Sequence, residues 1–308
     1  MLDAARLVLV SGPPDAAPAA MIERMVAEQK PAAIMTCWAQ VSGAAIAASP
    51  GLRLVARMGV GLDNIAVDAA TERGVLVTNV PDYCVEEVSD HAVGLVLAWT
   101  RGLVGADREV RDGRWDPAGA RLRRLATLTC GIVGFGRIGR ATARKLAGLG
   151  ARVIASDPLP PADTHGVHIM PLDELLGSSD AVIVHAPLTP ATHHLIGSRE
   201  LSLMPRGALL VNVSRGGLVD TGALIEALRD GRLGGAGLDV LETEPEVPHE
   251  LLEHPGVVIT PHIAFSSDVA VEQLRRSAAE EVVRVLSGEP PLHPCNQPAG
   301  ATASGPRG

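Results

Sequence analysis

Three side chains of types that suit acid–base chemistry follow apolar segments in the second half of the chain. Arg215 directly precedes a pair of glycines, Glu244 precedes a proline, and His262 follows another proline. Arginine grips a carboxylate with a planar, permanently charged fork, whereas histidine exchanges a proton near neutral pH. A carboxylate on the second ring nitrogen would fix the histidine tautomer and stabilise the charged ring. The set therefore suits a 2-hydroxy acid that loses its hydroxyl proton while a hydride leaves.

A glycine-rich segment in the middle of the chain has the spacing that binds dinucleotides. Gly134, Gly136 and Gly139 follow the apolar segment 130–133 and open a helical pattern. The first allows a tight turn, the second lets backbone approach a pyrophosphate, and the third permits close helix–strand packing. The helix N-terminus favours the phosphates, and Asp157 suits the ribose hydroxyls of NAD but repels the 2′-phosphate of NADP. The NAD-binding residues predicted here are Gly134, Gly136, Arg137, Ile138, Gly139 and Asp157.

The acidic partner of the histidine has two candidates in one segment. Glu242 and Glu244 both lie between the apolar segment 235–238 and Pro245. The turn before the proline favours Glu244, while the spacing leaves Glu242 as an alternative. Each charged residue, taken singly, is more often a solvated surface group. Their place beside a dinucleotide-binding segment favours a function instead.

Strand-like and helix-like segments alternate along the chain, which predicts parallel sheets covered by helices on both faces. The predicted strands are 7–10, 32–35, 52–56, 75–78, 130–133, 152–156, 181–185, 208–213, 235–238 and 257–260. The predicted helices are 20–29, 41–48, 66–73, 86–111, 140–149, 172–176, 221–229 and 266–286. The strands from 130 onward suffice for a doubly wound nucleotide-binding domain.

The mid-chain position of the glycine-rich segment predicts two domains. We expect an α/β protein with two doubly wound parallel sheets. A Rossmann NAD-binding domain, residues 98–283, would be inserted into a flavodoxin-like substrate-binding domain made of residues 1–97 and 284–308. The cleft between two such domains is the natural place for a small-molecule substrate.

Composition limits the classes of function. The chain has 308 residues, 46% hydrophobic and 20% charged, which fits a globular protein with sizeable cores. A net charge of −8 without a Lys/Arg cluster argues against nucleic acid as a partner. No apolar run is long enough to span a membrane. The cysteines lack paired spacing, so we expect no disulfide framework and a cytoplasmic location.

No metal site is predicted from the histidines. His193 and His194 lie in a polar segment and are expected to face solvent. His165 and His168 lack a third ligand at a recognisable spacing.

Together these segments resemble the D-isomer-specific 2-hydroxyacid dehydrogenases, which include phosphoglycerate dehydrogenase, glyoxylate/hydroxypyruvate reductase and the C-terminal binding proteins. The resemblance covers residues 7–296. It rests on segment 57–65 (RMGVGLDNI), the glycine-rich segment, segments 212–220 and 237–245, and the pair Pro261-His262.

The resemblance implies hydride transfer between NAD and a small D-2-hydroxy acid/2-oxo acid pair. His262 is the implied acid/base, Glu244 tunes it, and Arg215 binds the substrate. The backbone N–H groups of Val60 and Gly61 are implied to bind the substrate carboxylate.

The resemblance also assigns residues outside these motifs. Arg57 is implied to reach into the same substrate pocket. The further cofactor-binding residues that it implies are Thr189, Val213 and Asp239.

Segment 79–91 is most similar to the C-terminal binding protein branch and departs from it at three places. Cys84 stands where that branch often has Ser, Val88 where a cofactor-contacting Thr is common, and Ala264 where Gly is common. Two alternatives stay open: an NAD(H)-sensing binding protein of that branch, and an enzyme acting on phosphite or another small oxyanion. A homodimer is expected, with helix 86–111 as a candidate for the contact.

Overall fold

The computed structural model describes residues 5, 7–12, 17–119 and 122–298. The chain forms two compact units, Met1–Tyr83 with Ser267–Gly308, and Cys84–Ser266. The predicted boundaries at 97/98 and 283/284 would have cut two continuous helices, α4 (Val85–Thr100) and α11 (Asp268–Leu286). Each helix packs on the sheet of one unit: α4 contacts β8 and β9, and α11 contacts β1 and β2.

The smaller unit is built on a parallel three-stranded sheet in the order β1-β2-β3. Its strands are β1 (Ala33–Thr36), β2 (Leu54–Arg57) and β3 (Leu76–Thr78). Its helices are α1 (Ala19–Gln29), α2 (Gly43–Ala48), α3 (Val67–Glu72) and α11. Val55 and Val77 pack with the core of α1 to α3, whereas Leu54 packs with Val282 and Val285 of α11. Both faces of the sheet are therefore covered, which explains why β2 is buried throughout.

One predicted strand of the smaller unit is wrong. Residues 7–10 form no strand, and Val8 and Leu9 are 90% and 67% exposed. Leu7 packs against the cluster that contains Leu54 and Val282, yet residues 7–10 do not pair with β1, the strand at the edge of the sheet. Apolar composition alone therefore does not make this segment a strand.

The larger unit is a doubly wound Rossmann sheet, which confirms the predicted fold class. Its seven strands are all parallel in the order β10-β9-β8-β7-β4-β5-β6. The chain reverses direction across the sheet between β4 and β7, the switch point at which such folds bind ligands. The strands are β4 (Thr129–Val133), β5 (Arg152–Ser156), β6 (His168–Ile169), β7 (Ala181–Val184), β8 (Ala208–Asn212), β9 (Leu233–Leu238) and β10 (Val257–Ile259).

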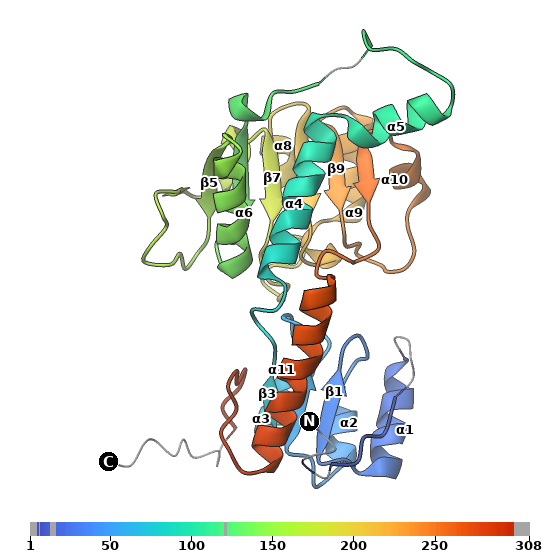
Figure 1. Cartoon of the computed structure of the whole chain (residues 1–308), viewed down its shortest axis with the longest axis vertical. Coiled ribbons are helices and arrows are strands. Elements are labelled where there is room, and N and C mark those ends of the chain that lie inside the picture. The colour runs from blue at the N-terminus through green and yellow to red at the C-terminus, as the bar shows by residue number, and fades with distance from the viewer. Residues whose placement is uncertain (1–4, 6, 13–16, 120–121, 299–308) are drawn as a thin grey trace. The chain divides into compact units, whose positions relative to one another are not determined.

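Helices cover both faces of this sheet (Figure 1). On one face α4 packs against α6, β8 and β9, while α6 contacts β4 and β5. On the other face lie α7 and α9, which contact β4, β5 and β9. The helices of this unit are α4, α5 (Leu103–Arg111), α6 (Arg137–Gly148), α7 (Leu172–Ser178), α8 (Ser198–Leu203), α9 (Thr221–Arg229) and α10 (His249–Glu253), with 3-10 turns η1 (Leu125–Thr127) and η2 (Gly216–Leu218).

The predicted single helix 86–111 is two helices. Gly102 adopts a left-handed φ of 60° between the end of α4 and the start of α5. The break occurs there because glycine alone enters this region without a Cβ penalty. The sequence also missed β6, α8 and α10, which are short elements with little periodicity. None of the helices in the described part of the chain is long and apolar enough to cross a membrane.

Candidate active site

The predicted dinucleotide loop joins β4 to α6 at the switch point of the larger sheet. Gly134 has a φ of 92°, and a Cβ there would lie 2.7 Å from the backbone nitrogen of Ala186. A Cβ on Gly139 would collide with the carbonyl of Gly134. Helix α6 can therefore pack this close to the loop only when residue 139 is glycine. No atom lies within 4 Å of the position a Cβ would take on Gly136. The first and third glycines are thus needed for packing, while the second opens space beside the N-terminus of α6.

Asp157 follows β5 and stands beside this loop. Its carboxylate accepts hydrogen bonds from the backbone N–H groups of Phe135, at 2.7 Å, and Leu159, at 2.8 Å. The Phe135 bond ties the acid to the glycine-rich turn. The carboxylate of Asp157 therefore stands beside the turn between β4 and α6.

A histidine–carboxylate pair lies at the same edge of the sheet, where β9 and β10 end. Nδ1 of His262 is 2.9 Å from Oε2 of Glu244, and the side chains are 19% and 39% exposed. Oε1 of Glu244 accepts from the backbone N–H of Leu241 at 3.0 Å. The carboxylate of Glu244 is thus held in place by the backbone, and the imidazole ring of His262 is partly exposed to solvent.

The electrostatics of Glu244 keep the carboxylate charged. Partial burial by itself raises the pKa of Glu244. The hydrogen bonds from His262 and Leu241, with the positive charges of His262 and Arg215, outweigh that effect, and the pKa lies below its ordinary value. An ionised Glu244 is the form that stabilises a protonated imidazole.

The backbone of His262 is held in an unusual conformation. Its φ is 53°, in the left-handed region that non-glycine residues rarely enter. The His262 N–H donates to the carbonyl of Asp239 at 2.8 Å, which fixes the turn. Strained residues of this kind persist where the surroundings over-determine them, often at functional sites.

Asp239 is a buried anchor for the histidine turn, and sequence reasoning assigned it only a cofactor contact. One oxygen accepts from the Thr260 hydroxyl at 2.6 Å and the Ile263 N–H at 3.0 Å; the other accepts from the Ala264 N–H at 2.8 Å. His91 of α4 lies 2.9 Å from the Thr260 hydroxyl. His91 and Thr260 were missed because their partners are distant in sequence, and no local spacing marks them.

Arg215 follows β8 at the same sheet edge. Asn212, which is buried, donates to the Arg215 carbonyl at 2.9 Å and accepts from the Ser214 N–H at 3.1 Å. The Arg215 guanidinium donates to the Ser214 carbonyl at 2.8 Å. The positive charge of Arg215 is the weakest of the causes that lower the pKa of Glu244.

The alternative carboxylate, Glu242, has different partners. Its Oε1 is 2.6 Å from Nε2 of His194, and its Oε2 accepts from the Thr221 N–H at 3.2 Å. Geometry therefore separates two residues that the sequence barely separated, and Glu244 is the one that faces His262.

The remaining predicted cofactor residues differ in exposure. Thr189 is exposed in the loop after β7, where its N–H and hydroxyl contact the Thr192 hydroxyl at 2.8 and 3.0 Å. Val213 is buried at the end of β8. Both stand at the carboxyl edge of the sheet.

The predicted substrate residues of the smaller unit form a loop after β2. Arg57 is only 5% exposed, and its guanidinium donates to the carbonyls of Gly61, at 3.0 Å, and Met58. A Cβ on Gly59 would lie 2.7 Å from the same guanidinium. Asn79 donates to the carbonyl of Val60 at 2.8 Å. In this conformation Arg57 shapes the loop that carries Val60 and Gly61.

A doubly wound nucleotide fold with a histidine–carboxylate pair at its carboxyl edge suits a dinucleotide-dependent oxidoreductase. Comparison with known proteins shows which family the chain belongs to. The D-isomer specific 2-hydroxyacid dehydrogenase NAD-binding domain matches residues 93–264. The chain is 43% identical over 258 residues to a glyoxylate reductase of Korarchaeum cryptofilum, covering 81% of this chain and 78% of that one.

A second relative and a solved structure are also dehydrogenases of 2-hydroxy acids. A D-3-phosphoglycerate dehydrogenase of Mycobacterium bovis is 42% identical over 252 residues, which span 81% of this chain but only 48% of that longer protein. The crystal structure of D-lactate dehydrogenase from Aquifex aeolicus, in complex with NAD and lactic acid, superposes with a TM-score of 0.80 at 31% identity, covering 87% of this chain and 86% of that one.

The chain belongs to the D-isomer-specific 2-hydroxyacid dehydrogenase family. It is an NAD-dependent enzyme. The open space at Gly136, the N-terminus of α6 and the carboxylate of Asp157 fit that cofactor.

Proposed function

We propose that the protein interconverts a small D-2-hydroxy acid and its 2-oxo acid, with His262 as acid/base, Glu244 tuning it and Arg215 binding the substrate. The observation that carries the proposal is the 2.9 Å contact between His262 Nδ1 and Glu244 Oε2 at the edge that also bears the dinucleotide loop. A charged carboxylate on Nδ1 assigns proton exchange to the other ring nitrogen, Nε2.

In the proposed reaction His262 transfers a proton, whereas Glu244 and Arg215 stabilise charged groups. Bound NAD supplies the acceptor for the hydride that leaves C2 of the hydroxy acid. His262 Nε2 takes the hydroxyl proton as the carbonyl forms, and Glu244 stabilises the resulting imidazolium. Arg215 holds the substrate carboxylate with charge-assisted hydrogen bonds. In the reverse direction His262 returns the proton to the carbonyl oxygen.

We extend the proposal to the binding residues predicted from sequence. Gly134, Gly136, Arg137, Ile138 and Gly139 would bind the pyrophosphate. Asp157 would bind the ribose and select NAD. Thr189, Val213 and Asp239 would line the nicotinamide end of the cofactor site.

The smaller unit would supply the remaining substrate contacts. The N–H groups of Val60 and Gly61 would bind the substrate carboxylate. Arg57 supports this assignment as the residue that fixes the conformation of their loop.

A substrate panel tests the proposed reaction. Purified protein is mixed with NADH and glyoxylate, pyruvate or 3-phosphohydroxypyruvate, and NADH absorbance is followed. We expect turnover of at least one of these acids. Phosphite with NAD belongs in the same panel, because turnover of phosphite alone would point to an oxyanion dehydrogenase. Binding of NADH with no turnover of any member would favour a sensing protein.

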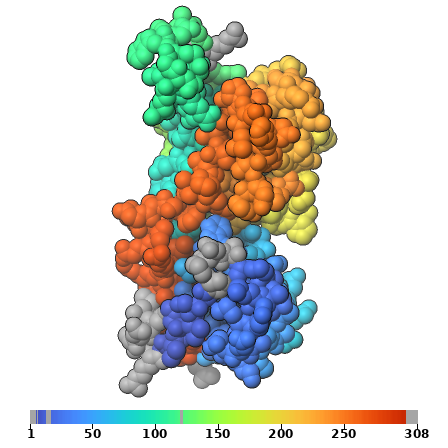
Figure 2. All heavy atoms as spheres, turned by 90° about the vertical axis from the view of Figure 1, so that its right-hand side faces the viewer, coloured from blue at the N-terminus to red at the C-terminus, as the bar shows by residue number. Residues whose placement is uncertain are grey.

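We also propose that the protein is a cytoplasmic homodimer. Helix α5 buries none of its residues, and the green residues that include it form a lobe at the margin of the larger unit (Figure 2). Leu103, Val110 and Trp115 are 57%, 50% and 83% exposed, so apolar surface is offered to a second copy. Light scattering would give about twice the 31.9 kDa chain mass for a dimer.

The cysteines bear on the proposed cytoplasmic location. All four are free thiols, which suits a reducing compartment.

A further inference from the structure

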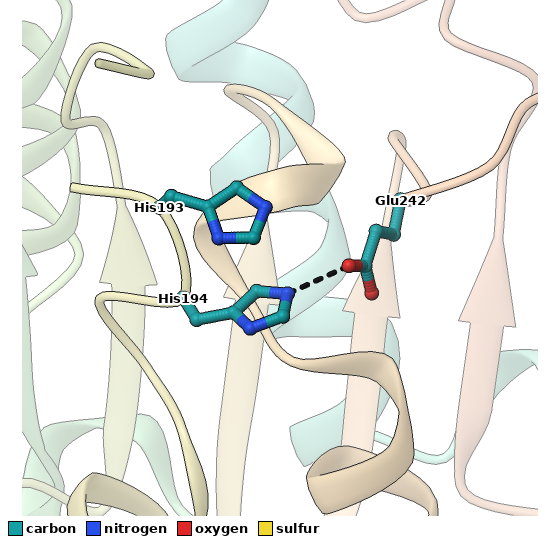
Figure 3. Close-up of side chains that lie close together, drawn as sticks. All are labelled: His193, His194 and Glu242. Carbon is teal, nitrogen blue, oxygen red and sulfur yellow. Dashed lines mark hydrogen bonds and ion pairs between the residues drawn. The ribbon is translucent and has the colours of Figure 1, made fainter. Parts of the chain in front are cut away.

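Three side chains of metal-ligating types, none of which belongs to the pair formed by His262 and Glu244, meet on the larger unit. They are His193 and His194, in the loop after β7, and Glu242, in the loop after β9 (Figure 3). Each offers a ligand atom, and these atoms all lie within 4.8 Å of one another. The imidazole rings of the two histidines lie 3.9 Å apart at their centroids. The atoms that bind one Zn²⁺ each lie about 2.0 to 2.2 Å from the ion, so the side chains must rotate to close this spacing around it.

The fold fixes two of the three side chains independently of any ion. The backbone N–H of His194 donates to the carbonyl of Gly217 at 2.8 Å, and its φ is 51°. Glu242 is held by the N–H of Thr221, the first residue of α9, and by Nε2 of His194 at 2.6 Å. Asp220, which caps the same helix, places a second carboxylate 3.9 Å from the other ring nitrogen of His194. A negative site facing two imidazoles therefore exists before a cation arrives.

Access and ligand chemistry both suit a transition metal. His193 and Glu242 are exposed and His194 is half-buried, so an ion can enter without opening the fold. Two imidazoles and one carboxylate favour Zn²⁺ over hard cations such as Mg²⁺, and leave a position for water.

We propose that His193, His194 and Glu242 form a surface site for one Zn²⁺ ion, which joins the loop after β7 to the loop after β9. The strand between them in the sheet is β8, so the ion bridges the segments on either side of the Arg215 loop. Glu244 lies in the same loop as Glu242. Occupancy of the site would therefore fix the segment that carries the partner of His262.

Metal binding to the whole chain, purified without a histidine tag, tests the proposal. Zn²⁺ is titrated by calorimetry, and Co²⁺ is used as a visible probe of the ligands. We expect one ion per chain. We expect H193A, H194N and E242Q each to weaken binding by at least about tenfold, since even removal of a group behind a ligand has that effect. Asparagine is chosen at 194 because it tolerates the left-handed backbone.

The matched control is H249A. His249 is an exposed histidine on α10, 76% exposed at its side chain, and it lies outside the cluster. This variant should bind one ion as the wild type does. His193 is exposed, so its replacement leaves the core intact, and NADH binding by H193A checks the fold. Failure of the wild type to bind one ion per chain, or wild-type affinity in all three cluster variants, would overturn the proposal.

Discussion

At the scale of single residues, the main feature of the candidate site is that hydrogen bonds fix the conformation of His262. His262 sits in a left-handed turn fixed by Asp239, and its ring is turned to Glu244. Sequence alone placed Glu242 and Glu244 on one loop and favoured Glu244 only by the turn before Pro245 and by the family resemblance. The structure separates the two residues, because the carboxylate of Glu242 is hydrogen-bonded to His194 and to the first N–H group of α9.

Replacing Glu244 by glutamine should change the pH dependence of turnover. Reduction of the 2-oxo acid needs a protonated His262, and the carboxylate stabilises that form. In E244Q we expect reductase activity to be lost at a lower pH than in the wild type. Initial rates of NADH oxidation from pH 5 to pH 9 measure this. E242Q, assayed with a metal chelator, is the matched control and should keep the wild-type profile; an unchanged profile in E244Q would contradict the role given to Glu244.

Replacing Asp157 by alanine should weaken the preference for NADH. The carboxylate bound by Phe135 and Leu159 repels a 2′-phosphate, and its loss removes about 1.4 kcal/mol or more of discrimination, or tenfold. Steady-state kcat/KM with NADH and with NADPH gives the ratio. D157N keeps a hydrogen-bond acceptor but no charge, so it should relax the preference as well. An unchanged ratio in both variants would assign selection to another residue.

At the scale of elements, the carboxyl ends of the parallel strands bring the site together. Gly134 follows β4, Asp157 follows β5, Arg215 follows β8, and His262 follows β10, so one sheet edge collects residues far apart in the chain. Strong period patterns and the glycine spacing made that edge predictable. The contact between loops was not predictable, because a loop conformation depends on packing that no local pattern encodes.

Gly216 marks one such loop contact and gives a test of it. A Cβ at Gly216 would collide with the backbone of Leu241 and Glu242, so G216A must displace the segment that leads to Glu244. We expect kcat to fall roughly tenfold to a hundredfold. G217A is the matched control: the atoms nearest to its Cβ would belong to the side chains of Leu188, at 3.3 Å, and His193, at 3.6 Å, and not to backbone. Equal activity of the two variants would contradict this positioning.

His185, at the end of β7, should make stability depend on pH. It lies 2.9 Å from the Thr142 hydroxyl, and burial lowers its pKa to about 3. A depressed histidine pKa means that the unfolded chain binds the extra proton, so stability falls as pH drops below about 6.5 towards 3. Between pH 7 and pH 5 the wild type should lose about 2 kcal/mol more than H185Q, at about 1.4 kcal/mol per unit. Urea unfolding at both values measures this; equal losses would sink the assignment.

At the scale of the whole molecule, the chain is two α/β units in which the second interrupts the first. The mid-chain position of the glycine-rich segment predicted two units. The boundaries between the units lie just before the first residues of α4 and α11, whereas the predicted boundaries lie inside these helices. A period pattern locates a helix without saying which sheet it covers. Segment 7–10 was predicted as a strand from its apolar composition, which does not say whether the segment pairs with a neighbouring strand.

The most direct test of the account is the turnover of H262A. NADH oxidation is measured with the best 2-oxo acid from the panel, and NADH binding is measured separately by fluorescence. Loss of the proton donor should lower kcat by about 10² to 10⁴ while NADH affinity stays close to that of the wild type, because the dinucleotide loop lies on other strands. Wild-type turnover in H262A would contradict the central claim that His262 moves the proton of the reaction.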